Sequence, residues 1–164
     1  MVGGGVRTIA FLVFVLTVSG CAAKPQAIFP DAVAVRAYAA GGPVHVGNDG
    51  TVTAFKPSPD GKSAVTVPPA GGDYLTAEEI ASLRSAISFS KPPEMSTACC
   101  IPRHAFVFYD RDNRYLGYLL VCFQCGCAEM KPMPATDPDQ SYINWDQARV
   151  HQILEAHRLP IRRE

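Results

Sequence analysis

Residues 105–123 read AFVFYDRDNRYLGYLLVCF, the densest apolar segment of the chain. Two aromatic and β-branched runs, 105–109 and 115–123, flank the charged sequence DRDNR. Apolar runs joined by a short polar turn are typical of a β-hairpin. Because both faces of each run are apolar, we expect this hairpin to lie in the centre of a sheet rather than at its edge, and to form the core.

Two helices are predicted, one before and one after the hairpin. Thr76 and Glu79 fit a capping box, and the apolar residues that follow recur on one face of a helix at about 76–88. A second helix at about 145–158, with Asn144 as its cap, carries a similar apolar stripe and is followed by a proline. The fold class expected is therefore α+β, with a small antiparallel sheet packed against two helices.

The segment upstream of the first helix divides into two parts. Residues 43–70 alternate apolar patches with the turn sequences NDG and SPDG, which predicts a short meander of strands. Residues 22–42 are rich in Ala, Pro and Gly and are typical of a tether. Within the tether, residues 31–40 form one short element. Asp31 could cap a helix there, whereas alternating valines fit a strand, and both assignments remain open.

The amino-terminal segment has the order of a secretory signal. An apolar run at residues 9–18 follows Arg7 and precedes small residues and a cysteine. Such a run rises only about 15 Å as a helix, roughly half the hydrocarbon thickness of a bilayer, so it is too short to remain as a transmembrane helix. Residues 1–20 are therefore predicted to be a signal peptide that is removed.

The tetrapeptide Val18-Ser19-Gly20-Cys21 resembles the lipobox of bacterial lipoproteins. The resemblance implies cleavage before Cys21, a lipid on its thiol and an acyl chain on its new amino group. Each buried methylene contributes about 0.8 kcal/mol, so two or three acyl chains anchor a protein almost permanently. Ala22 in place of aspartate implies, by the same resemblance, a position in the outer membrane facing the periplasm. The organisation expected is a lipidated tether at 21–42 and a single domain at 43–164.

Charge and motif content exclude several classes of function. The chain has 15 Lys and Arg residues against 15 Asp and Glu residues, a formal net charge of zero. A neutral chain has no long-range field for nucleic acid, so we expect no such partner and a membrane attachment through acyl chains alone. The usual signatures of serine hydrolases, nucleotide-binding loops and zinc proteases are absent. We therefore expect a non-enzymatic protein of the cell envelope, whose partner protein the sequence does not identify.

Five of the six cysteines and one histidine flank the predicted hairpin in the sequence, before its first strand and at the end of its second. They are Cys99, Cys100 and His104 before the first strand and Cys122, Cys125 and Cys127 at the end of the second. In an antiparallel pair the start of one strand lies beside the end of the other, so the two groups should come together. Three kinds of chemistry fit such a cluster.

The first is disulfide bonding, because an exported protein meets an oxidising compartment. With Cys21 lipidated, five thiols remain, enough for two bridges and one unpaired thiol. A bridge from Cys99 or Cys100 to Cys122 or Cys125 would stabilise the fold by about 3 kcal/mol in the chain-entropy model. A structural disulfide cluster is the leading hypothesis.

The second is metal binding by thiolates. One of Cys99 and Cys100 could join His104, Cys122 and Cys125 in a tetrahedral zinc site, with Cys127 as a substitute ligand. Copper(I) suits the same thiolates.

The third is thiol exchange by the pair Cys122 and Cys125. Reactive pairs usually place the first thiol at a helix amino terminus, where its pKa is lowered. Because Cys122 instead ends an apolar strand, this hypothesis ranks third.

The domain also resembles a group of uncharacterised exported bacterial proteins. The resemblance covers about residues 74–160 and rests on Leu75-Thr76-x-Glu78, on a cysteine two or three residues before Pro102, and on Val121-Cys122-Phe123-x-Cys125. It implies the order helix, hairpin, helix and assigns no activity. Cys127 and the second cysteine of the pair at 99–100 stand outside this pattern.

Overall fold

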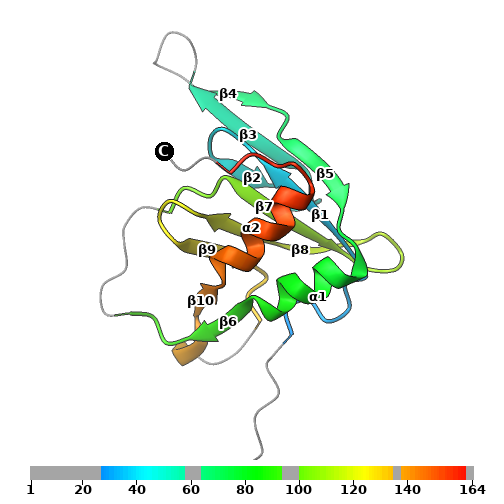
Figure 1. Cartoon of the computed structure of the whole chain (residues 1–164), viewed down its shortest axis with the longest axis vertical. Helices are drawn as coiled ribbons and strands as arrows, with labels where there is room; N and C mark the ends of the chain where they lie inside the picture. Colours follow the sequence, from blue (N-terminus) through cyan, green and yellow to red (C-terminus); the bar gives the residue numbers. More distant parts are fainter. Residues whose placement is uncertain (1–26, 58–63, 94–99, 135–137, 162–164) are drawn as a thin grey trace, which may run out of the picture.

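A five-stranded antiparallel sheet, in the order β5-β1-β7-β8-β9, forms the centre of the computed structural model (Figure 1). Its strands are β1 (Ala34–Ala39), β5 (Ala70–Tyr74), β7 (His104–Tyr109), β8 (Tyr115–Cys122) and β9 (Cys127–Lys131). The structure describes residues 27–57, 64–93, 100–134 and 138–161. The predicted signal peptide, Cys21 and Cys99 lie outside these ranges.

The predicted central hairpin is confirmed as β7 and β8, which pair with each other and lie between β1 and β9. The turn that joins them is fixed by Asp110, whose carboxylate accepts hydrogen bonds from the backbone N–H groups of Asp112 and Arg114, both at 2.8 Å. Both faces of the hairpin are buried. One face carries Phe106, Phe108, Leu119 and Val121, and the other carries Ala105, Val107, Tyr118 and Leu120.

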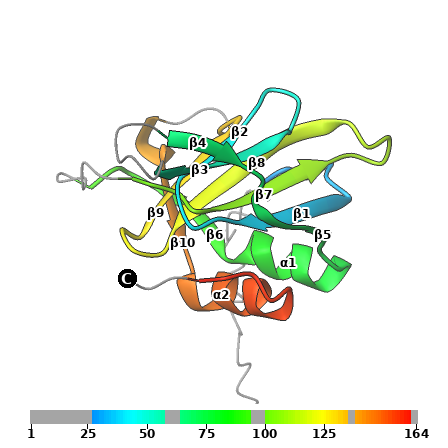
Figure 2. The ribbon, with the colours of Figure 1, turned by 90° about the horizontal axis from the view of Figure 1, so that it is seen from above.

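The predicted meander is also confirmed, as a separate three-stranded sheet in the order β2-β3-β4. Its strands are β2 (Val44–Val46), β3 (Val52–Pro57) and β4 (Ala64–Val67). Buried Val44, Val46 and Ala54 pack on the second face of the hairpin. Figure 2 shows this small sheet on one side of the central sheet and the two helices on the other, so the hairpin lies in the middle layer.

The two helices are α1 (Ala77–Ser85) and α2 (Gln147–Ala156). The capping box at the start of α1 is confirmed, since Thr76 Oγ1 accepts from the Glu79 N–H and the Glu79 carboxylate accepts from the Thr76 N–H. In the ranges that the structure describes, neither helix has the length and apolarity that crossing a membrane requires.

The structure corrects the predicted ends of both helices. The first helix stops at Ser85, and β6 (Ile87–Ser90) follows it at once. Asn144 does not cap the second helix, because it belongs to β10 (Tyr142–Trp145), which pairs with β6. The cap is Asp146, whose carboxylate accepts from the Arg149 N–H at 3.1 Å. A single 3-10 turn, η1 (Pro138–Gln140), precedes β10.

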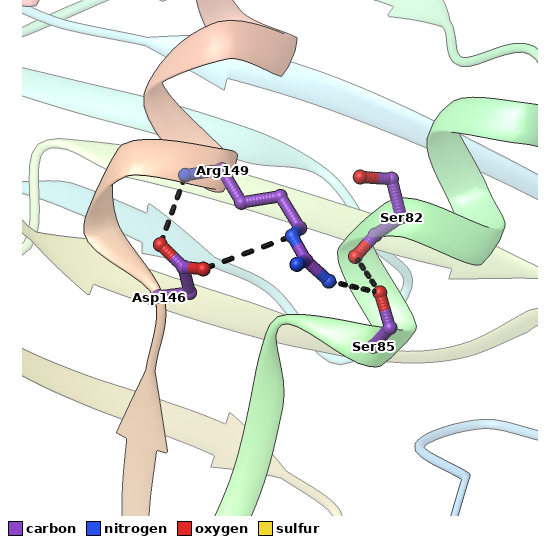
Figure 3. A network of polar contacts seen from close by, with 4 residues as sticks. All are labelled: Ser82, Ser85, Asp146 and Arg149. Atoms are coloured by element: carbon purple, nitrogen blue, oxygen red, sulfur yellow. Dashed lines mark hydrogen bonds and ion pairs between the residues drawn. The ribbon is translucent and has the colours of Figure 1, made fainter.

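Figure 3 shows polar contacts that join the two helices. The Arg149 guanidinium on α2 donates to Ser85 Oγ on α1 at 2.7 Å and lies 3.7 Å from the Asp146 carboxylate. Ser85 Oγ in turn donates to the carbonyl of Ser82 at 2.8 Å. A second link joins Glu79 to His157, with 3.1 Å between the carboxylate and Nε2. These contacts fix the spacing of the helices on the sheet.

The folded domain begins before residue 43, which corrects the predicted tether. The short element left open between helix and strand is β1, which lies between β5 and β7 in the central sheet. Ile28 is 1% exposed, and the ring of Phe29 stacks on Phe108 with 4.2 Å between centroids. Arg84 on α1 donates to the carbonyls of this segment at Ile28, Phe29 and Ala32. Residues 27–42 are therefore part of the domain, because apolar contacts and these hydrogen bonds hold them.

Candidate functional site

The sequence Cys122-Phe123-Gln124-Cys125-Gly126-Cys127 forms the turn between β8 and β9. Cys122 and Cys127 are partners at the last rung of this antiparallel pair, so the turn places both beside Cys125. β9 was not predicted, because Cys127-Ala128-Glu129-Met130-Lys131 contains none of the β-branched and aromatic residues that are typical of strands. The turn is the centre of the candidate site.

Hydrogen bonds and one glycine hold the shape of this turn. Gly126 has φ +65°, a left-handed conformation that glycine adopts without steric cost. Its carbonyl accepts from the indole N–H of Trp145 at 3.0 Å, which ties the turn to β10. The backbone N–H of Cys125 donates to Cys122 Sγ at 3.3 Å. The sulfurs are therefore held in fixed positions by the backbone.

A disulfide joins Cys100 to Cys127, with 5.8 Å between their Cα atoms. The sequence left the pairing of the cysteines open, with a bridge from Cys99 or Cys100 to Cys122 or Cys125 as one possibility. The observed bond joins the same two groups but ends at Cys127, because the turn places Cys127 at the start of β9 and leaves Cys122 and Cys125 as free thiols. The segment before β7 is thus tied to β9, the strand at the far edge of the central sheet.

Three sulfurs gather in this turn, those of Cys122, Cys125 and Cys127, and all lie within 4.8 Å of one another. Cys125 Sγ lies 3.9 Å from Cys127 Sγ. Because a disulfide sulfur carries no proton, only the Cys125 thiol can donate in that contact. The cluster could hold a metal ion, but thiolate ligation by Cys127 requires that its disulfide first be reduced.

The two free thiols differ in their surroundings. Cys122 is 2% exposed, and burial raises the pKa of its thiol, with a further rise from the neighbouring Cys125 side chain. The backbone N–H groups of Cys125 and Gln124 act in the opposite direction. Cys125 is only partly buried. Cys122 is therefore a protonated, enclosed thiol, while Cys125 is the free thiol nearer to solvent.

His104 has neighbours other than the sulfurs. Its ring is 3% exposed, and Nε2 lies 3.0 Å from the carbonyl of Pro160, so Nε2 carries the proton and donates it. The ring contacts the edge of Phe123, with 5.2 Å between centroids. Nδ1 is buried with no hydrogen-bond partner, and burial lowers the pKa of the imidazole. The ligating atoms that gather in the turn are sulfurs alone, which corrects the predicted set that included His104.

A surface hollow of about 480 Å³ lies next to the turn, over Phe123 and the exposed side of α2. Its polar lining includes Gln147 and the pair His151 and Glu155, whose Nδ1 and carboxylate oxygen are 3.2 Å apart. Phe123 also contacts Trp145, with 4.9 Å between ring centroids. Phe123 therefore separates this hollow from the core around His104.

The pairing of β7 with β8 brings Cys100 to the second cysteine group, as predicted, while Cys99 lies outside the described residues. Trp145, predicted to begin a helix, instead lies in β10 and holds the turn through its indole N–H. The glycine after the second cysteine of Cys-x-x-Cys was the signal for a tight turn, and therefore for a following strand.

Comparisons of the chain with protein families, with curated proteins and with solved structures give no match.

Proposed function

We propose that this chain is a lipid-anchored protein of the cell envelope whose domain is non-enzymatic and is stabilised by the disulfide between Cys100 and Cys127. The lipobox-like sequence at 18–21 supports the anchor at Cys21, and Ala22 supports a place in the outer membrane, facing the periplasm. The disulfide is the observation that carries the proposal. Such bonds persist in exported proteins and are rare in reducing compartments.

The position of the disulfide supports a structural role. It connects residues 27 apart in the sequence, and closing a loop of that size contributes about 3.5 kcal/mol in the chain-entropy model. It also fixes the start of β9, which has no neighbour on its outer side within the five-stranded sheet. The bond therefore opposes fraying of an edge strand.

The free thiols fit this role better than thiol-exchange catalysis. Only a thiolate attacks a disulfide, and burial raises the pKa of Cys122. Cys122 also ends β8, rather than beginning a helix whose dipole would lower that pKa.

Mass spectrometry of the mature protein, extracted from membranes of a bacterial host, tests the anchor. We expect an amino-terminal peptide that begins at Cys21 and carries acyl chains, and a protein that fractionates with membranes. Cys21→Ser should abolish acylation, whereas Cys99→Ser, the matched control, should leave it intact. An unmodified Cys21 in the wild type would refute the proposal.

A second candidate function is thiolate metal binding. The observation that favours it is the gathering of three sulfurs within 4.8 Å in the turn between β8 and β9. Zinc and copper(I) are the metals that such soft ligands select. Metal analysis after purification without added metal or reductant tests it, together with a count of free thiols. Stoichiometric zinc or copper would favour this function. A protein that contains no metal in either preparation, whether purified without reductant or under reducing conditions, would reject it.

A further inference from the structure

We propose that the Cys100–Cys127 disulfide is a redox lock on a four-sulfur metal site formed by Cys100, Cys122, Cys125 and Cys127. This inference rests on the second candidate function and adds the fourth ligand and the control of the site. In the oxidised protein the site is closed, because two of its four sulfurs are bonded to each other. Reduction of that bond opens it.

The number of ligands is the first argument. Structural zinc sites hold four ligands, and among the described residues the free thiols that the oxidised cluster offers are those of Cys122 and Cys125. Breaking the disulfide adds two thiols in one step. Cys127 already lies in the cluster. Cys100 stands outside that group of three, but its sulfur is bonded to Cys127, so it starts one bond away from the cluster. A Cys₄ set results without any other residue.

The spacing of the sulfurs is the second argument. In a tetrahedral zinc site with Zn–S bonds of about 2.3 Å, neighbouring sulfurs are about 3.8 Å apart. The sulfurs of Cys125 and Cys127 are separated by 3.9 Å, and no pair among Cys122, Cys125 and Cys127 exceeds 4.8 Å. Shifts of less than about 1 Å would therefore bring these three into ligating positions around one ion.

The backbone supplies the third argument, because it holds the sulfurs of the turn in place without the disulfide. The Cys125 N–H donates to Cys122 Sγ and keeps these two residues side by side. Trp145 holds the Gly126 carbonyl on the other side of the turn. Neither contact involves the disulfide, so both are expected to persist when it is reduced. The turn is thus preorganised before any metal arrives.

The reductant of the Cys100–Cys127 disulfide is a dithiol. The dithiol gives two electrons and two protons to the Cys100–Cys127 bond, becomes a disulfide itself and leaves two thiols on the protein. Zn²⁺ then displaces the protons of the four thiols as it binds, so the affinity rises with pH. An acceptor disulfide then oxidises Cys100 and Cys127 back to their bond, taking up their two electrons and two protons from water to become a dithiol. Zn²⁺ would be released as Cys122 and Cys125 regain their protons from water.

Cobalt(II) titration of the full chain in detergent tests the lock. Metal-free protein is prepared in two forms. The oxidised form keeps the disulfide, and the other form is reduced with a phosphine that is removed before titration. We expect the reduced form to bind one cobalt per chain, with thiolate-to-cobalt charge-transfer absorption that Zn²⁺ abolishes. The oxidised form should bind at least about tenfold more weakly, since it lacks two ligands.

Two single variants sharpen the test. Cys100→Ser removes the lock and one ligand, so its cobalt affinity should no longer depend on reduction and should fall below that of the reduced wild type. Cys99→Ser is the matched control and should keep both the stoichiometry and the redox dependence. Circular dichroism of every form checks that the strands persist, and cobalt binding by a reduced chain that has lost them would overturn the proposal.

The failures are distinguishable. Equal cobalt affinity in the oxidised and reduced wild type would overturn the lock and leave metal binding standing. Binding in neither form would reject the metal site itself, and the lock with it. A Cys99→Ser variant that loses binding while Cys100→Ser keeps its redox dependence would show that the wrong cysteine has been assigned.

Discussion

Among single residues, Arg84 makes the contacts that most clearly could not be foreseen from the sequence. Its guanidinium donates to three backbone carbonyls of the segment before β1, those of Ile28, Phe29 and Ala32. Hydrogen bonds from a charged donor contribute about 1.5–3 kcal/mol each when partly buried. Arg84 therefore fixes the place where the chain enters the domain.

Replacement of Arg84 should lower the free energy of unfolding. We expect Arg84→Met to cost about 2–4 kcal/mol, because it removes three hydrogen bonds from a charged donor, although the Phe29 carbonyl keeps the N–H of Ala32. Arg84→Lys should recover only part of this, since one ammonium group cannot reproduce the guanidinium fork. Urea denaturation gives the values, with exposed Arg111→Met as the control. An Arg84→Met protein as stable as the wild type would refute the assigned role.

His104 makes stability depend on pH in a defined direction. Burial, with smaller contributions from Arg103 and His151, lowers its pKa in the folded state below the ordinary value of about 6.5. Near pH 6.5 the His104 imidazole therefore binds a proton in the unfolded chain but not in the folded chain. The stability that His104 contributes is complete above about pH 6.5 and is lost as the pH falls towards the folded-state pKa, by at most about 1.4 kcal/mol per pH unit.

His104→Gln tests this dependence, because glutamine can still donate to the Pro160 carbonyl but does not titrate. Urea denaturation between pH 7 and pH 5 should show a smaller loss of stability in the variant than in the wild type. Gln152→Ala, at an exposed position in α2 whose side chain does not titrate, should keep the wild-type slope. Identical slopes in wild type and His104→Gln would contradict the assignment.

Among the elements, α1 shows how far local sequence signals reach. Its capping box is made by neighbouring residues, so the sequence predicted it without knowledge of the fold. Thr76→Ala removes the acceptor for the Glu79 N–H and should lower the free energy of unfolding by about 1 kcal/mol. Thermal or urea denaturation measures the loss, with exposed Thr66→Ala in β4 as the control. No difference between the two variants would mean that the cap does not stabilise the helix.

The start of α2 shows where local signals fail. Asn144 and Asp146 are both good cap residues, and the sequence alone does not choose between them. The choice depends on β6, whose Ser90 Oγ accepts from the Asn144 side chain at 2.7 Å. This pairing joins residues more than fifty positions apart and keeps Asn144 in a strand. A long-range contact therefore set the boundary of a local element.

In the whole molecule, the apolar pattern of residues 105–123 correctly predicted a central hairpin, and the structure adds that both of its faces are buried. The position of β1 was not predictable in the same way, since its alternation was too short and its neighbours β5 and β7 are distant in sequence. The cysteine site was predicted at the correct end of the hairpin. The partner of Cys100 was not, because it depends on β9, whose sequence gives a weak strand signal.

Loss of the disulfide should destabilise the entire domain. We expect Cys100→Ser and Cys127→Ser each to lower the free energy of unfolding by about 3.5 kcal/mol, because both release the same loop of the unfolded chain. Cys125→Ser, which leaves the bond intact, is the matched control and should cost less than about 1 kcal/mol. Equal losses in all three variants, measured by urea denaturation, would show that the bond has no special role in stability.

Disulfide mapping of the oxidised protein tests the account of the cysteine cluster most directly. Free thiols are alkylated while the protein unfolds in denaturant at mildly acidic pH, so that the buried Cys122 thiol reacts before disulfides can exchange, and tandem mass spectrometry after digestion then separates the neighbouring cysteines. The structure predicts a peptide pair linked through Cys100 and Cys127, with Cys122 and Cys125 recovered as free thiols. A bond between Cys122 and Cys125, or one from either of them to Cys100, would contradict it.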